Sequence, residues 1–178
     1  MRDFDCNLFT NSFKRSVCYF ISYDTTMQIF DADTCWITRR GVRQAYCELF
    51  CHIAEIVGLT ADIIPGRTKA SGGQVSSDKH AWLFVYTNEY DGLLIDPTWG
   101  AGVVVDGKFI KSNDNSMWYN VSPYWMAFSH FPDSKLWSRL EIEITEEQFA
   151  SLPYKLPSIE GDGKDELFDS LRRCNETN

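Results

Sequence analysis

The feature that most constrains the fold of this chain is a change of hydrophobic period at Gly58. Before it, apolar residues recur at three- and four-residue spacing, which places one wide apolar stripe on a helix from about Val42 to Val57. The stripe consists of Tyr46, Leu49, Phe50, Ile53, Ala54 and Val57. Gly58 favours the backbone conformation that ends helices, and short β-type runs follow it. The sequence therefore predicts an α+β fold, with N-terminal helices packed on an antiparallel sheet.

The expected strands are short and are separated by recognisable turns. They cover residues 61–65, 81–87 and 93–95, followed by 103–105 with 109–110. Asp106-Gly107 is typical of a two-residue hairpin turn, and 88–92 forms a looser turn. Residues 67–78 show no period and are expected to form a long surface loop. Earlier in the chain, apolar residues at helical spacing predict a first helix that ends near Tyr23.

Length and composition indicate one globular domain followed by a tail. With 178 residues, 44% of them hydrophobic, the chain has enough apolar material for a single core, which we assign to residues 1–157. Thr145 with Gln148 three residues later is a capping-box pattern and predicts a short helix to about Ser151. Residues 158–178 are acidic and contain glycines, so we expect a mobile tail there.

The net charge indicates which classes of partner are unlikely, and the cysteines indicate the cellular compartment. Asp and Glu outnumber Lys and Arg by 25 to 17, which gives a net charge of -8 and argues against nucleic acid as a partner. No apolar stretch approaches the roughly 20 residues that span a bilayer, which argues against a membrane role. The six cysteines form no C-x-x-C pair, and no secretion signal is visible. We therefore expect reduced thiols and a cytoplasmic location.

The histidines do not predict a metal site by their spacing. Only His52, His80 and His130 are present, and none lies at ligand spacing from another. Cys47 and Cys51 lie one turn apart on the predicted apolar helix, where cysteine behaves as a small hydrophobic residue. The sequence predicts neither a metal nor a cofactor, and His130 is expected to anchor the aromatic C-terminal section.

His80 and Asp96 form a candidate pair at one end of the predicted sheet. His80 opens one strand and Asp96 closes the next, so the two residues come out roughly opposite, within about two to four positions. Such a pair can orient an imidazole as general base for a nucleophile on a third element. A helix N-terminus suits that nucleophile, because its dipole lowers a thiol's pKa and stabilises an oxyanion. Gly41-Val42 precedes such a helix, and the next residue is Arg43.

The order of these segments resembles a known family. Gly41-Val42-Arg43-Gln44-Ala45-Tyr46, His80-Ala81-Trp82 and Asp96-Pro97-Thr98-Trp99-Gly100 resemble the transglutaminase-like superfamily, which has a papain-like Cys-His-Asp fold. His130-Phe131-Pro132-Asp133 with Trp137 is similar to the kyphoscoliosis-peptidase branch. The resemblance extends over about residues 14–157. It implies that His80 is the base, that Asp96 is the orienting acid, and that Arg43 stands at the position of the nucleophilic cysteine.

Arginine at that position disables the chemistry that the resemblance implies. A guanidinium is neither a nucleophile nor a proton donor at working pH. Beside His80 it would disfavour the imidazolium, and it could pair with Asp96 instead. We therefore expect a degenerate, non-catalytic domain with a protein- or peptide-binding or scaffolding role, and the oligomeric state is left open. Candidate binding residues are Trp82, Trp99 and Gln44, although the two tryptophans also fit core or wall positions.

Two alternatives stay open at the level of sequence. The chain could be an active cysteine peptidase or protein-glutamine acyltransferase that uses a displaced cysteine. Cys47 lies one turn deeper than Arg43 on the same helix face, and Cys35 lies eight residues too early. A degenerate branch of the superfamily that recognises DNA damage implies DNA binding, which the acidic charge disfavours.

Overall fold

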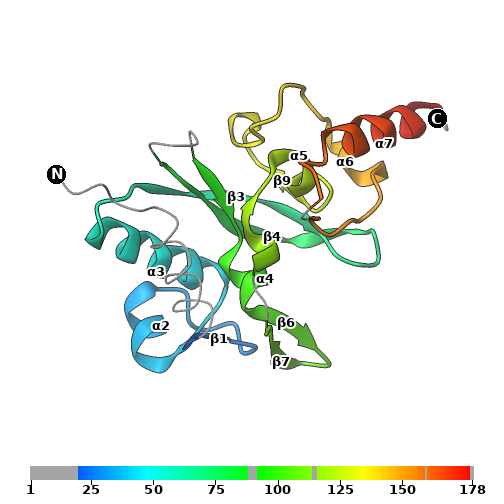
Figure 1. The fold of residues 1–178 in the computed structure, drawn as a ribbon. Coiled ribbons are helices and arrows are strands. Elements are labelled where there is room, and N and C mark those ends of the chain that lie inside the picture. Colours follow the sequence, from blue (N-terminus) through cyan, green and yellow to red (C-terminus); the bar gives the residue numbers. More distant parts are fainter. Residues whose placement is uncertain (1–19, 88–91, 114–115, 159, 177–178) are drawn as a thin grey trace. The chain divides into compact units, whose positions relative to one another are not determined.

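A computed structural model of the chain describes residues 20–87, 92–113, 116–158 and 160–176 (Figure 1). Helices and antiparallel strands are both present, which confirms the predicted α+β class. The described chain divides into two compact units. Unit 1 holds the residues up to Ile63 together with Trp82–Asn120, and unit 2 holds Ile64–Ala81 together with the residues from Val121 onward. No helix within these ranges combines the length and the apolarity needed to cross a membrane.

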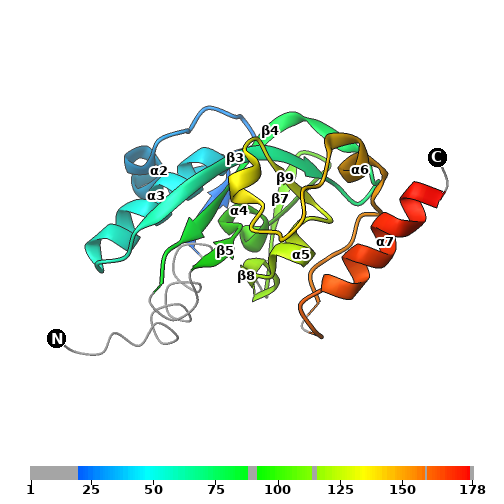
Figure 2. The same cartoon turned by 90° about the horizontal axis from the view of Figure 1, so that it is seen from above.

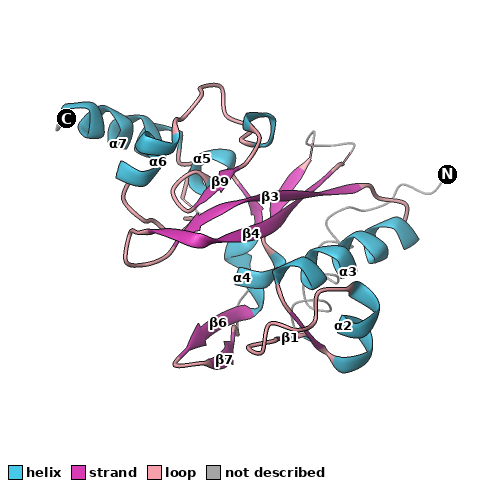
Figure 3. Ribbon diagram, turned by 180° about the vertical axis from the view of Figure 1, so that it is seen from behind, coloured by secondary structure: helices cyan, strands magenta, loops and turns pink. Residues whose placement is uncertain are grey.

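The helices of unit 1 centre on the predicted amphipathic helix, which the structure confirms as α3 (Arg43–Ile56). Of the apolar stripe, Tyr46, Leu49, Phe50 and Ala54 are buried. The helix ends before Gly58, whose φ of +80° breaks the helical path. Helix α2 (Ala32–Thr38), which the sequence pattern missed, lies beside α3 in Figures 1 and 3. The described part of unit 1 also contains α4 (Pro97–Ala101) and the 3-10 helix η1 (Ser116–Trp118).

Unit 1 also contains two short pairs of strands. Strand β1 (Ser22–Tyr23) pairs in parallel with β2 (Arg40–Gly41). The first helix was predicted to end near Tyr23; that end is wrong, and residues 1–19 lie outside the described chain. The hairpin of β6 (Gly102–Val105) and β7 (Lys108–Lys111) confirms its prediction, because Asp106 and Gly107 both have the positive φ of a tight turn. Most of the turn expected at 88–92 also lies outside the described residues.

The predicted long loop at 67–78 is wrong. Strand β3 (Ala61–Lys69) continues past Pro65, and β4 (Val75–Val85) begins well before Ala81, so only residues 70–74 connect them. The start of β4 gave no apolar signal because Ser77, Asp78 and Lys79 are exposed. Together with β5 (Leu93–Ile95), β8 (Tyr119–Val121) and β9 (His130–Pro132), these strands form a five-stranded sheet in the order β8-β5-β4-β3-β9.

The helices of unit 2 gather around a cluster of apolar side chains. Helix α6 (Glu146–Ser151) begins with the predicted capping box between Thr145 and Gln148, which confirms that prediction. Figure 2 shows α7 (Lys164–Glu176) with α5 (Pro123–Met126) and α6 nearby. The 3-10 helix η2 (Lys135–Trp137) precedes this group.

Helix α7 occupies most of the segment that was expected to be a mobile tail. Its residues Leu167 and Leu171 are one helical turn apart and are buried against Ala127, Phe128 and Leu152. The acidic start of the segment hid this apolar pair, because its average composition is polar even though one face is not. Residues 164–176 therefore form part of the core of unit 2.

Lys69 is a buried cation that joins β3 to α6 within unit 2. Its ammonium donates hydrogen bonds to the backbone carbonyls of Phe149, Ala150 and Leu152 at the C-terminal end of the helix. The carbonyl ends of helices carry partial negative charge, so a cation is well placed there. Burial nevertheless lowers the pKa of Lys69 to about 8.

Candidate functional site

Asp96 is fixed by the helix that it begins. It is the N-cap of α4, and one carboxylate oxygen, Oδ1, accepts hydrogen bonds from the backbone N–H groups of Thr98 and Trp99, each at 2.9 Å. Pro97 follows at the first helical position, where a missing N–H costs nothing. The backbone N–H of Asp96 donates a hydrogen bond to the carbonyl of Trp118 at 2.9 Å. A side chain that is 1% exposed and held at this many points has one orientation.

His80 is aligned with Asp96 by a strand pair. Leu83 of β4 pairs with Ile95 of β5, and continuing that antiparallel register puts Asp96 opposite Trp82. His80 precedes Trp82 by two residues and therefore points to the same face of β4. The predicted offset of two to four positions agrees with this register.

A second histidine, which sequence spacing did not connect to the first, lies near His80. His130 in β9 pairs with Thr68 of β3, and the centres of the His80 and His130 rings are 5.7 Å apart with a tilt of 58°. The hydroxyl of Ser129 is 2.8 Å from Nδ1 of His130 and fixes the orientation of the ring. Both imidazoles are nearly excluded from solvent.

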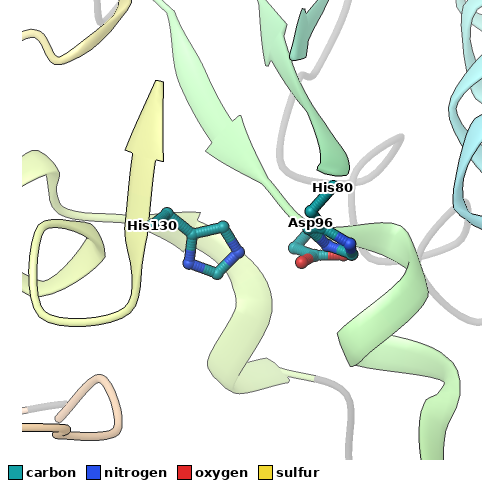
Figure 4. A group of neighbouring side chains, drawn as sticks. All are labelled: His80, Asp96 and His130. Atoms are coloured by element: carbon teal, nitrogen blue, oxygen red, sulfur yellow. The ribbon is translucent and has the colours of Figure 1, made fainter. Parts of the chain in front are cut away.

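Figure 4 shows the side chains of His80 and His130, which belong to unit 2, and that of Asp96, which belongs to unit 1. All three residues are buried. Imidazoles such as these can act as general bases or as metal ligands.

The N-terminus of α3 lacks a side-chain cap. The N-cap residue is Val42, whose side chain accepts no hydrogen bond from the N–H groups of the helix. The first turn contains no acidic residue. Arg43 occupies the first helical position and is half-buried. The ion pair with Asp96 that the sequence allowed does not form between these two described residues. Arg43 is therefore a cation at the positive end of a helix dipole.

The loop that follows β1 is held by hydrogen bonds to Asp24, and it contacts the start of α3. Oδ1 of Asp24 accepts from the hydroxyl of Thr26 at 2.7 Å, and Oδ2 accepts from the N–H groups of Gln28 at 2.9 Å and Ile29 at 3.1 Å. The loop that results presents the carbonyl of Ile29 to the N–H of Val42 at 2.9 Å. The hydrogen bond from Thr26, with those from the backbone, lowers the pKa of Asp24 to about 2.

Asp24 also forms an ion pair with Arg40 at 3.0 Å, although Arg40 is half-exposed. The N–H of Asp24 donates to the carbonyl of Gly41 at 2.9 Å. These contacts tie the strand before α3 to the loop that follows β1. Sequence patterns did not single out Asp24, because its partners lie on two separate segments.

Gly41 is required by close packing between α2 and α3. A Cβ atom added there would lie 2.8 Å from both the Cβ of Ala45 and the Sγ of Cys35. Real Cβ atoms essentially never approach other heavy atoms this closely, so any larger residue would force neighbouring atoms of α2 or α3 to shift.

The two cysteines considered as displaced nucleophiles are buried. Cys35 and Cys47 are both 0% exposed, and burial raises the pKa of Cys35 to about 11. Cys51 is half-buried; burial, with a smaller contribution from Asp62, raises its pKa to about 11 as well. Because the thiolate is the reactive form, burial and a high pKa argue against nucleophilic roles for these side chains.

The candidate binding residues occupy three different environments. Trp82 is 1% exposed and belongs to the core. Trp99 is half-buried, and its ring meets that of Trp118 edge-on at 4.8 Å between centres. Gln44 donates a hydrogen bond from Nε2 to Glu48 at 2.9 Å along the outside of α3. Of the two tryptophans, Trp99 is the one that a ligand can reach without opening the core.

Comparisons with known proteins add little to this geometry. No protein-family model matches the sequence, and no curated protein matches it. Among solved structures, the chain is similar to one described as a crystal structure of a TGase, with 19% sequence identity and a TM-score of 0.41. The similarity covers 58% of this chain and 28% of that one, so this chain spans less than a third of the neighbour's length.

Proposed function

We propose that this chain is a transglutaminase-like domain that has lost covalent catalysis and acts by binding a protein or peptide. The observation that carries the proposal is Arg43 at the first position of α3, where a nucleophile would need to stand. A guanidinium cannot attack a carbonyl carbon or take part in thiol acyl transfer. Asp96, locked by α4, and His80, aligned on β4, are the retained partners of the lost nucleophile.

The loss of catalysis is tested on the native chain with a thiol reagent and two activity assays. We expect iodoacetamide to label Cys35, Cys47 and Cys51 of the native protein slowly, because Cys35 and Cys47 are buried and Cys51 has a raised pKa. We also expect neither hydrolysis of a peptide library nor incorporation of a primary amine into glutamine-containing peptides. A fast-labelling cysteine, whose modification abolishes a measurable turnover, would contradict the proposal.

The binding role is tested separately with the same glutamine-containing peptide library as the probe. The expected result is saturable binding, measured by fluorescence anisotropy, that Trp99→Ala weakens at least tenfold. Trp36→Ala is the matched control, because Trp36 is an exposed tryptophan on α2. Absence of binding, or equal weakening by both substitutions, would contradict a peptide-binding role that involves Trp99.

A further inference from the structure

We propose that two copies of this chain associate through the free edge of β6, so that their β6–β7 hairpins join into one four-stranded antiparallel sheet. This inference goes beyond the proposed function and does not depend on it. Both strands belong to unit 1 and form a sheet of their own, in which each strand has one neighbour among the described strands. A strand edge of this kind presents backbone donors and acceptors to a further strand.

The register of the hairpin identifies the backbone groups that face the free edge. Hydrogen-bonded pairs alternate with non-hydrogen-bonded pairs along an antiparallel ladder. The N–H of Ser112 donates to the carbonyl of Ala101 at 2.8 Å, which marks their pair as hydrogen-bonded. Val104 is three residues further along the chain and lies opposite Phe109, so its pair is of the non-hydrogen-bonded kind. The N–H and C=O of Val104 therefore point away from β7, and the described residues offer them no hydrogen-bond partner.

The side chains of β6 are apolar, and much of their surface is exposed to solvent. Val103, Val104 and Val105 are 46–58% exposed, and Ile110, which lies opposite Val103, is 54% exposed. Val103, Val105 and Ile110 share one face of the hairpin, because side chains alternate along a strand. β-branched residues pack well against the side chains of a neighbouring strand. Strand β6 therefore has the backbone groups and the side chains of a strand inside a sheet, with a neighbour on one side only.

The other edge of the hairpin is less suited to pairing. Strand β7 lies beside β1, as Figures 1 and 3 show. It also carries Lys108 and Lys111, and lysines on an edge strand oppose pairing with a further strand. Strand β6, in contrast, has no charged residue between its ends. The free edge of β6 is therefore the edge that accepts a further strand.

A second copy of the chain supplies a strand that is complementary to β6. In a symmetric antiparallel pair the two-fold axis would pass beside Val104. The outward N–H and C=O of Val104 would then form hydrogen bonds with the same groups of Val104 in the second copy. Val103 would lie opposite Val105 of the second copy, so that valine packs against valine on the apolar face.

The same register also matches charges. Within one hairpin, Lys111 pairs with Gly102. In the four-stranded sheet Asp106 of one copy would lie opposite Gly102 of the other, and Lys111 of that copy would follow one strand further on the same face. The two-fold axis repeats this arrangement, so opposite charges would come together at both ends of the β6 pairing.

The test is sedimentation equilibrium of the full-length native protein. We expect a dimer, and we expect Val104→Lys and Val104→Glu each to raise its Kd by about tenfold or more, because like charges would face each other across the two-fold axis. An equimolar mixture of the two variants should restore dimerisation. Ile37→Lys is the matched control, since Ile37 is an apolar residue on α2 that is 79% exposed, and it should leave the Kd unchanged. A native protein that stays monomeric at about 1 mM, or a dimer that Val104→Lys does not weaken, would overturn the proposal.

Amide hydrogen exchange of the native protein, followed by NMR, gives a second measurement that needs no variant. The N–H of Val104 should become more protected as the protein concentration rises through the Kd. The N–H of Phe109 is the internal control, because it points to the outer edge of β7, and its exchange should not change. Exchange at Val104 that is independent of concentration, or protection at Phe109 instead, would also overturn the proposal.

Discussion

Helices α3 and α4 both begin in unit 1, and their first turns are built in opposite ways. Helix α4 has a side-chain cap, because Asp96 accepts hydrogen bonds from two N–H groups of its first turn. Pro97 follows at the first helical position. Helix α3 has no side-chain cap, no acid in its first turn and a cation, Arg43, at its first position. Instead, the loop held by Asp24 provides the carbonyl of Ile29 as acceptor for the N–H of Val42, the N-cap residue of α3.

The two helix starts are expected to differ in their contribution to stability. A self-capped helix end satisfies its own amides and favours stability. A helix N-terminus without a cap or a nearby acid is less stable, because the positive end of its dipole is not compensated. The same arrangement lowers the pKa of a thiol or binds an anion placed there. The start of α4 therefore favours stability, whereas the start of α3 has the uncompensated positive end of a helix dipole.

The largest effect is expected at Asp24. Asp24→Ala removes the acceptor for the N–H groups of Gln28 and Ile29 and for Arg40, so we expect the free energy of unfolding to fall by about 3 kcal/mol. Urea denaturation of both proteins measures it. A loss below about 1 kcal/mol would show that α3 does not depend on this loop.

The same substitution has a pH signature. The pKa of Asp24 is lowered from 3.8 to about 2, so its stabilisation is fully present above about pH 3.8 and is lost as the pH falls through about 2. The difference in unfolding free energy between the native protein and Asp24→Ala should therefore shrink over that window. A constant difference would contradict the hydrogen-bonded carboxylate described for Asp24.

The next largest effect is expected at Asp96. Asp96→Ala leaves two N–H groups of α4 without their acceptor, and we expect a loss of about 2 kcal/mol. Asp96→Asn keeps an oxygen in the place of Oδ1 and is expected to cost less than half as much. Chemical denaturation of the two variants checks this order, and equal losses would mean that capping is not the role of the carboxylate.

Gly41→Ala tests how closely α2 and α3 approach before the start of α3. The added Cβ would lie 2.8 Å from Ala45 and Cys35, and we expect destabilisation by about 1–2 kcal/mol. Gly72→Ala is the matched control, because a Cβ there meets nothing within 4 Å, and it should be neutral. Thermal denaturation of the pair compares them. A neutral Gly41→Ala would show that the interface can relax.

The smallest effect is a gain of stability at Arg43. Replacing the cation at the positive end of α3 by an anion, as in Arg43→Glu, should raise the unfolding free energy by about 0.5–1 kcal/mol at low salt. Arg43→Gln should fall between the two, and molar salt should reduce the gain. A loss of stability in Arg43→Glu would indicate that the guanidinium is held by favourable contacts.

Features set by neighbouring residues were predictable from the sequence. Helix α3, the capping box at Thr145 and the Asp106-Gly107 turn depend on local spacing, and all three are confirmed. The register of His80 and Asp96 was also accessible, because one hairpin links them. These elements needed no knowledge of the rest of the chain.

Features set by distant contacts were not predictable in this way. One face of helix α7 is buried against Phe128 and Leu152, although its acidic sequence predicted a mobile tail. The approach of His130 to His80 depends on the pairing of β9 with β3, and the role of Asp24 depends on a loop that bonds to β2. Single-sequence patterns carry no information on which segments meet.

Our proposal requires that residue 43 stand at a position able to activate a thiol. The most direct measurement is the iodoacetamide labelling rate, at neutral pH, of Arg43→Cys compared with Ile56→Cys, which places a thiol at the opposite end of α3 where Ile56 is 82% exposed. We expect the thiol of Arg43→Cys to react at least tenfold faster than that of Ile56→Cys, although residue 43 is less exposed. We also expect His80→Gln to remove part of this advantage. Equal or slower labelling at 43 would contradict it.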